Sequence, residues 1–163
     1  MFQQLLREEN IFLDVQAAEQ EDALREVVNR VPEWALTPEQ RTEALGLLNI
    51  REKFGTTAIG DGLAFPHCYI QGLKFPLAVL AISQKGIEYR SLDGAAVNVI
   101  FMLILPQEEA AQQEKQRIVH AVQQVLSDAF LRERVKCASS PEEAFEWLLR
   151  EEHITYPGLQ QVS

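Results

Sequence analysis

The sequence predicts an α/β fold in which a mixed central β-sheet is sandwiched between helices on both faces. Two long segments, residues 77–83 (LAVLAIS) and 96–106 (AVNVIFMLILP), are apolar throughout and rich in Val, Ile and Leu. Such runs are typical of strands that are covered on both faces. Segments on either side of them repeat apolar residues at helical spacing, so layers of helix and sheet are expected. With 163 residues and no internal repeat, one domain with a substantial core is expected.

The first third of the chain predicts a short strand and two helices. Residues 11–15 (IFLDV) alternate as a strand would. A helix then follows and ends at a proline; its apolar positions are Ala23, Leu24, Val27, Val28 and Val31. The next helix begins at Thr37 as N-cap, with Pro38 at the first helical position and Gln40 completing a capping box. We expect this helix to end near residues 50–51.

The second half predicts the two long strands and three helices. Residues 85–94 (KGIEYRSLDG), between the strands, predict polar turns around a short edge strand. A helix after the second strand has its apolar positions at Ile118, Val119, Val122, Val125, Leu126 and Ala129. Ser127 is the expected N-cap of a further short helix. Ser140 and Glu143 form the capping box of the last helix.

Composition excludes several classes of function. A net charge of −9 argues against non-specific nucleic-acid binding, which needs a basic surface, and favours a partner with a basic patch. Cys68 and Cys137 have no CxxC spacing, so neither a disulfide framework nor a structural zinc site is expected. The start of the chain lacks the apolar stretch of a signal peptide, and no run is long enough to insert in a membrane. A cytoplasmic location is therefore expected.

His67 is the candidate reactive residue in the stretch GDGLAFPHC (residues 60–68). Pro66 fixes its own φ and favours an extended Phe65, so His67 is expected at the end of a short strand. The glycines at 60 and 62 allow close approach of the backbone to a ligand and can aim N–H groups at an anion. These features leave two interpretations open: a structural turn, or a device that presents one imidazole.

Other chemistries have weaker support in the sequence. His120 points away from the apolar stripe of its predicted helix, and His153 follows the last predicted helix, so both are expected in solvent. His67 and Cys68 are adjacent and cannot readily share one metal ion, nor form a nucleophile pair on an extended chain. No GKS or GKT follows the glycines, which excludes a P-loop.

Residues 51–68 (REKFGTTAIGDGLAFPHC) resemble the phosphorylation-site signature of one family of bacterial phosphotransferase-system enzymes IIA. This is the fructose/mannitol type, which includes the nitrogen-related regulatory IIA. The matching positions, in order, are Arg51, Glu52, Gly55, Thr57, Ile59, Gly60, Gly62, Pro66 and His67. The similarity covers nearly the whole chain. A single IIA-type domain is therefore expected over residues 1–152, with a mobile tail over 153–163.

The resemblance implies a phosphocarrier. In this family the carrier protein HPr passes a phosphoryl group to the IIA histidine, here His67, and in transporters a IIB domain and the sugar receive it next. Arg51 matches the arginine near the site, and a guanidinium suits phosphoryl oxygens. Thr57 is a candidate hydroxyl donor. No metal or other cofactor is implied. The alternative is a regulatory protein that controls a partner according to its phosphorylation state, without sugar transport.

Three positions depart from the family pattern. Phe65 stands where a smaller aliphatic residue is usual, and Cys68 where glycine is usual. Many relatives also carry a second histidine on the helix after the last strand, and that position corresponds to Lys115 here. We expect Lys115 either to replace this donor with a permanent positive charge or to lie in solvent.

Overall fold

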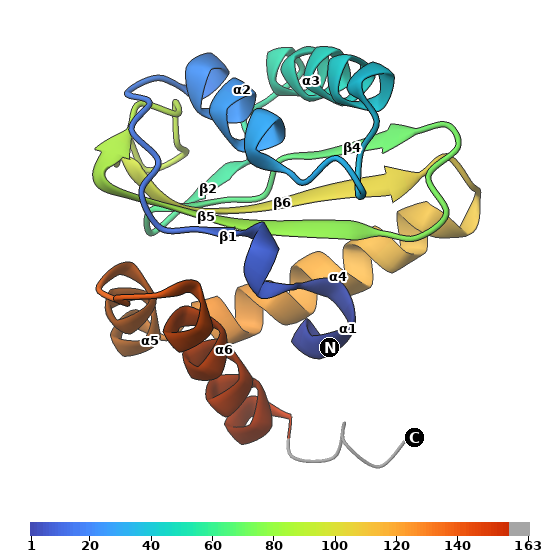
Figure 1. Ribbon diagram of the computed structural model, residues 1–163. Helices are drawn as coiled ribbons and strands as arrows, with labels where there is room; N and C mark the ends of the chain where they lie inside the picture. Colours follow the sequence, from blue (N-terminus) through green and yellow to red (C-terminus); the bar gives the residue numbers. More distant parts are fainter. Residues whose placement is uncertain (157–163) are drawn as a thin grey trace.

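The computed structural model describes residues 1–156 and contains a six-stranded mixed sheet. The strands are β1 (Ile11–Phe12), β2 (Ala58–Gly60), β3 (Leu63–Ala64), β4 (His67–Ile70), β5 (Leu77–Ile87) and β6 (Val97–Pro106). Their order across the sheet is β1-β5-β6-β3-β2, and β4 also pairs with β6 (Figure 1). β5 and β6 are antiparallel, whereas β1 runs parallel to β5, and both β3 and β4 run parallel to β6.

Helices cover both faces of this sheet, which confirms the predicted fold class. α2 (Gln20–Arg30) and α3 (Pro38–Lys53) lie on one face, and α4 (Ala110–Leu126), α5 (Ala129–Lys136) and α6 (Pro141–Thr155) lie on the other (Figure 1). A short α1 (Phe2–Leu5) and a 3₁₀ turn, η1 (Glu8–Asn10), precede β1. The predicted capping box of α3 is present: Gln40 N–H donates to Thr37 Oγ1 (3.2 Å), and Thr37 N–H donates to Gln40 Oε1 (3.1 Å).

The two central strands supply both hydrophobic cores. Because successive side chains of a strand point to opposite faces, Val79, Ala81 and Met102 pack under α2 and α3, while Leu80 and Phe101 pack over α4 to α6. Burial on both faces of the sheet therefore explains the long apolar runs of β5 and β6, as the sequence indicated.

β3 and β4 pair one after the other with the same side of β6, and the segment between them contains Pro66. Leu63 lies beside Val99 and His67 lies beside Leu103, so the register with β6 is unchanged across the break. Pro66 has no N–H to donate, but its carbonyl accepts from Leu103 N–H at 2.9 Å. His67 is therefore at the end of a strand, as expected, but it is the first residue of β4 and does not follow directly on β3, which stops at Ala64.

Other element boundaries also differ from those predicted. β1 covers only Ile11–Phe12, β5 continues past residue 83 to Ile87, and α3 continues to Lys53. The N-cap of α5 is Asp128, whose side chain accepts from Leu131 N–H at 2.7 Å, whereas the Ser127 hydroxyl donates to the Gln124 carbonyl.

The predicted tail began too early. α6 continues to Thr155, so the boundary at residue 152 falls inside a helix, and His153 is an exposed residue of that helix. Residues 157–163 of the expected tail lie outside the described residues.

Candidate functional site

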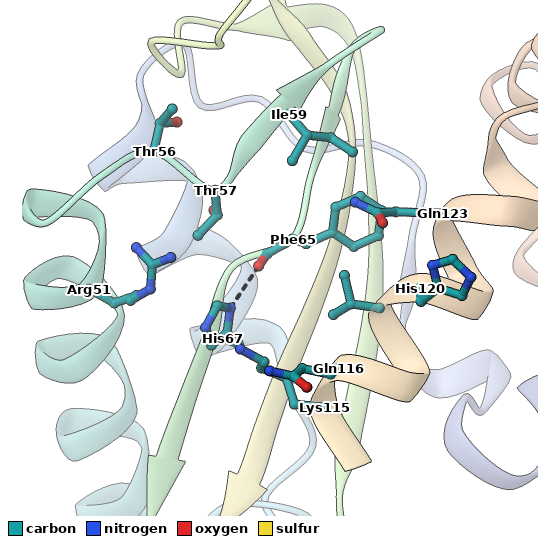
Figure 2. Close-up of a pocket in the computed structure, with 11 residues that line it drawn as sticks. Arg51, Thr56, Thr57, Ile59, Phe65, His67, Lys115, Gln116, His120 and Gln123 are labelled. Atoms are coloured by element: carbon teal, nitrogen blue, oxygen red, sulfur yellow. Dashed lines mark hydrogen bonds between the residues drawn. The ribbon is translucent and has the colours of Figure 1, made fainter. Parts of the chain in front are cut away.

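The orientation of the His67 ring is fixed by the main chain. Its Nδ1 lies 3.0 Å from the carbonyl oxygen of Phe65, two residues earlier (Figure 2). A carbonyl oxygen only accepts, so Nδ1 carries the hydrogen of this bond. In the neutral ring the lone pair is then on Nε2. The structure therefore has a defined candidate nucleophile, His67 Nε2.

The surroundings of His67 favour its neutral form. Burial is the main influence and lowers the pKa of His67 below its ordinary value near 6.5. The hydrogen bond to Phe65 acts in the opposite direction, and the positive charges of Lys115 and Arg51 lower the pKa further. A neutral imidazole keeps the lone pair that attack on a phosphoryl group requires.

His67 faces a small open cavity of about 270 Å³ between α3, β2 and α4 (Figure 2). We call it the His67 cavity. The residues that line it are Arg51, Thr56, Thr57, Ile59, Phe65, His67, Lys115, Gln116, Val119, His120 and Gln123. These residues include two permanent cations and no carboxylate. The cavity thus suits an anion, in contrast to the net charge of −9 of the whole chain.

Arg51 lies in the last turn of α3, on the side of the cavity opposite α4 (Figure 2). Its Nη1 donates to the Gly55 carbonyl at 2.8 Å, which holds the guanidinium beside the loop that leads to β2. A guanidinium has five N–H donors in a planar fork. The Gly55 contact therefore leaves donors that can bind oxygens placed next to His67.

Thr57 lines the same cavity but directs its hydroxyl elsewhere. The hydroxyl and the backbone N–H of Thr57 both donate to the carboxylate of Glu52, the N–H at 3.0 Å. The hydroxyl of buried Tyr89 donates to the same carboxylate at 3.2 Å. The single hydrogen of the Thr57 hydroxyl is thus committed to Glu52. A phosphoryl contact of Thr57 stays a prediction and would require this hydrogen to be redirected.

Lys115 lines the cavity from the second turn of α4, facing His67 across it (Figure 2). Of the two expectations for this residue, the geometry favours the one in which its charge acts on His67. Sequence reasoning assigned His120 to solvent. Its side chain is indeed exposed, yet it also lines the cavity, one turn beyond Gln116. The spacing of Gln116, His120 and Gln123, beside the apolar stripe of α4, is the signal that could have placed them there.

The glycines at 60 and 62 do not take part in this site. They form the turn of the β2–β3 hairpin, with φ of 114° and 72°, and Asp61 between them donates its N–H to Asp93 Oδ2 at 2.9 Å. A positive φ explains why glycine is used at both positions. Neither glycine is among the residues that line the His67 cavity, so the structure gives no support to their approaching a ligand there.

The described residues contain no group of three or more side chains suited to hold a metal ion. Over the same part of the chain, no helix is both long and apolar enough to cross a bilayer.

The fold and the site define a mixed α/β domain that presents one half-buried histidine to a cavity lined by two cations and no carboxylate. Residues 4–151 match the family described as phosphoenolpyruvate-dependent sugar phosphotransferase system, EIIA 2, and the chain belongs to this family. The sequence resemblance is thereby confirmed.

Relatives from both branches of this family are similar to the chain. A nitrogen regulatory protein of Pseudomonas aeruginosa is 32% identical over 96 residues, which are 59% of this chain and 61% of that protein. The matched part thus spans about three fifths of that relative. A nitrogen regulatory protein of Bradyrhizobium diazoefficiens is 31% identical over 68% of this chain and 71% of its own length. The fructose-specific EIIABC component of Bacillus subtilis is 29% identical over 61% of this chain and 16% of its own length.

Solved structures confirm the fold. The nitrogen regulatory protein IIA-Ntr of Neisseria meningitidis superposes with a TM-score of 0.79 at 24% identity, covering 88% of this chain and 96% of the other. The IIA mannitol domain of Escherichia coli superposes with a TM-score of 0.71 at 23% identity, covering 88% and 98%.

Proposed function

We propose that this chain is a phosphoryl carrier in which Nε2 of His67 is the acceptor atom. The observation that carries the proposal is the Nδ1–H···O=C bond to Phe65, which leaves the Nε2 lone pair free beside Arg51 and Lys115. Membership of the EIIA 2 family supports a phosphotransferase role. The proposed donor is a phosphohistidine of an HPr-like protein, and we expect the exchange to take place in the cytoplasm.

The proposed transfer needs no proton movement at the reacting nitrogen. The lone pair of His67 Nε2 attacks phosphorus, a new N–P bond forms, and the donor N–P bond breaks with its electron pair returning to the donor imidazole. The hydrogen stays on Nδ1 and continues to be donated to the Phe65 carbonyl, which stabilises the positive charge that phosphorylation brings to the ring. The Arg51 guanidinium and the Lys115 ammonium stabilise charge on the three phosphoryl oxygens. The protein's role is therefore mainly positioning and electrostatics.

The rim of the His67 cavity supports a protein as donor and acceptor. Ile59 lines the cavity and is exposed, and the end of α3, which also carries Arg51, has two further exposed apolar residues, Ile50 and the C-cap Phe54, which is 86% exposed. Exposed apolar side chains around a reactive group are typical of a docking surface. This fold is also found in a solved complex from Escherichia coli, in which enzyme IIA mannitol is bound to phosphorylated enzyme IIB mannitol. We propose that an HPr-like protein, and then a IIB domain or a regulatory target, docks on this rim.

The names of two relatives favour the regulatory branch as a second candidate function. The Pseudomonas and Bradyrhizobium proteins are both called nitrogen regulatory proteins. In this version, His67 is phosphorylated in the same way, and the phosphorylated and unphosphorylated surfaces bind a target protein differently. A IIB domain that accepts the label from the phosphorylated chain would favour transport. A target that binds only one phosphorylation state would favour regulation.

The experiment for the proposed acceptor is phosphorylation with phosphoenolpyruvate, enzyme I and HPr. We expect an acid-labile, base-stable phosphoprotein whose NMR signals show phosphorus on Nε2. His67→Ala should abolish the label, whereas the matched variants His120→Ala and His153→Ala should retain it. Label that survives in His67→Ala would refute the assignment.

A further inference from the structure

The His67 cavity is open to solvent and has room for a small molecule. Its volume of about 270 Å³ lies just below the range of about 300–1,000 Å³ that is typical of small-molecule pockets. A molecule placed in it lies next to the His67 ring, which is only half-buried (Figure 2). The cavity therefore gives small phosphoryl donors, as well as a docked protein, access to the candidate nucleophile.

Two cations without counter-ions stand on opposite sides of this cavity. Arg51 belongs to the last turn of α3, and Lys115 faces His67 from α4 (Figure 2). Neither cation forms a salt bridge with any residue among 1–156, and no carboxylate is among the lining residues. A phosphoryl group, which carries two negative charges, therefore meets two unpaired positive charges there.

The rest of the lining is apolar or neutral. Ile59, Phe65 and Val119 offer a surface that a short hydrocarbon group can contact. The side-chain amides of Gln116 and Gln123 have N–H groups that can donate to a carbonyl oxygen. The lining thus suits a small molecule with a phosphoryl group at one end and a short acyl group at the other.

We propose that His67 also accepts a phosphoryl group directly from a small acyl phosphate, with acetyl phosphate as the representative donor. An acyl phosphate is a mixed anhydride of phosphoric acid and a carboxylic acid. The inference rests on the proposed function, because it uses the same acceptor atom. It adds a second route to the phosphorylated chain, one that needs neither enzyme I nor HPr.

The step balances without a proton or a further reactant. The lone pair of His67 Nε2 attacks phosphorus and forms the N–P bond. The bond from phosphorus to the acyl oxygen breaks, and its electron pair leaves with the carboxylate, so acetate is released. A carboxylate is a weak base whose conjugate acid has a pKa of about 4, and it therefore leaves unprotonated. The Nδ1 hydrogen remains in its bond to the Phe65 carbonyl.

Other small phosphoryl donors fit the cavity less well. A phosphate ester would release an alkoxide, which is a strong base and needs a proton as it leaves. Lys115 could supply this proton only by losing the charge that stabilises the phosphoryl oxygens. ATP exceeds the size of the cavity and brings Mg²⁺, which carboxylates bind, and the lining has no carboxylate. The acyl phosphate is the class that matches both the size and the charges.

The test is incubation of the full chain with acetyl phosphate in the absence of enzyme I and HPr. We expect ³¹P NMR to show phosphorus on Nε2 of a histidine, with release of acetate. The rate constant should exceed that of N-acetylhistidine at the same pH by at least about tenfold, since the cavity positions the donor. His67→Ala should give no label, and glucose 6-phosphate, a phosphate ester, should give none with the parent chain.

Variants of the two cations separate the cavity from general imidazole chemistry. Lys115→Gln and Arg51→Lys should each slow labelling by acetyl phosphate at least about tenfold. Lys53→Gln is the matched control, because it removes a charge two residues after Arg51 on α3. Lys53 is exposed and does not line the cavity, so its replacement should change the rate by less than about twofold.

The outcomes distinguish this inference from the proposed function. A rate no higher than that of N-acetylhistidine, label in His67→Ala, label from glucose 6-phosphate, or equal rates in the three cation variants would overturn the inference. Label on His67 from HPr but not from acetyl phosphate would overturn it and leave the proposed function standing. Label from acetyl phosphate alone would support it and exclude only the HPr-like donor. Absence of label from both donors would overturn both proposals.

Discussion

Replacement of Glu52 tests whether a carboxylate behind the His67 cavity holds the site together. Glu52 is the residue after Arg51 and accepts hydrogen bonds from the Thr57 N–H, the Thr57 hydroxyl and the Tyr89 hydroxyl. It ties the end of α3 to the strand that begins after Thr57. The next link is the Thr57 carbonyl, which accepts from Phe65 N–H at 3.0 Å, two residues before His67.

The structure sets the expected magnitude. A hydrogen bond to a charged group contributes about 1.5–3 kcal/mol, and a buried polar group left unpaired costs about 1–3 kcal/mol. Glu52→Ala removes three such bonds and leaves the hydroxyl of Tyr89, which is 0% exposed, without its carboxylate. We expect a loss of about 4 kcal/mol in the free energy of unfolding. Glu52→Gln keeps one oxygen acceptor and should lose about 2 kcal/mol.

Thermal and urea unfolding measure this loss directly. For a chain of this length, about 4 kcal/mol corresponds to a decrease in Tm on the order of 10 °C. Glu43→Gln, an exposed glutamate on the same helix, is the matched control and should change stability by less than about 0.5 kcal/mol.

A double-mutant cycle separates the Tyr89 contact from the rest. Tyr89→Phe and Glu52→Ala share one hydrogen bond, so their combined effect should fall short of the sum by about 1 kcal/mol. The proposed phosphorylation of His67 should also slow in Glu52→Gln, because the last turn of α3, which carries Arg51, is held less firmly. A Tm of Glu52→Ala within 2 °C of the parent chain, or full additivity with Tyr89→Phe, would refute this reasoning.

Three further predictions concern the charges around His67. Lys115→Gln should raise the pKa of His67 in an NMR titration, because it removes a like charge; an unmoved titration would place Lys115 in solvent only. Arg51→Lys should slow phosphoryl transfer about 10²-fold, because the planar fork is lost, with little change in Tm; unchanged kinetics would exclude the proposed role. Because folding lowers the pKa of His67, the unfolded chain binds more protons below about pH 6.5. Stability should therefore fall as the pH decreases from 6.5 through the lower folded pKa, and His67→Leu should flatten this part of the urea-unfolding profile.

Local signals were sufficient for most of the fold. The start of α3 was predictable because its capping box involves residues three apart, and both of its hydrogen bonds are present. The long strands were predictable because burial on both faces demands an apolar residue at nearly every position. The continuation of β5 to Ile87 was not, since it passes through the polar residues Gln84 and Lys85, which are exposed.

The site was predictable only in part, because its contacts join distant or main-chain groups. His67, Arg51 and Lys115 followed from the family resemblance, and the structure places all three around one cavity. The bond from Tyr89 to Glu52 spans 37 residues, and no local spacing indicates it. The partner of His67 Nδ1 is a carbonyl, which every residue has, so no residue type at position 65 could have revealed it.

That carbonyl also bears on how such a domain can diverge. Which nitrogen of His67 is free for the proposed reaction depends on the path of the backbone at Phe65 and Pro66, which follows β6 in constant register. Substitution of the side chain at position 65 leaves this acceptor in place. Under the proposed function, the residues lining the His67 cavity can therefore change with the docking partner while the acceptor atom stays the same. Descendants of one ancestral domain can in this way acquire new partners without having to rebuild the chemistry of their histidine.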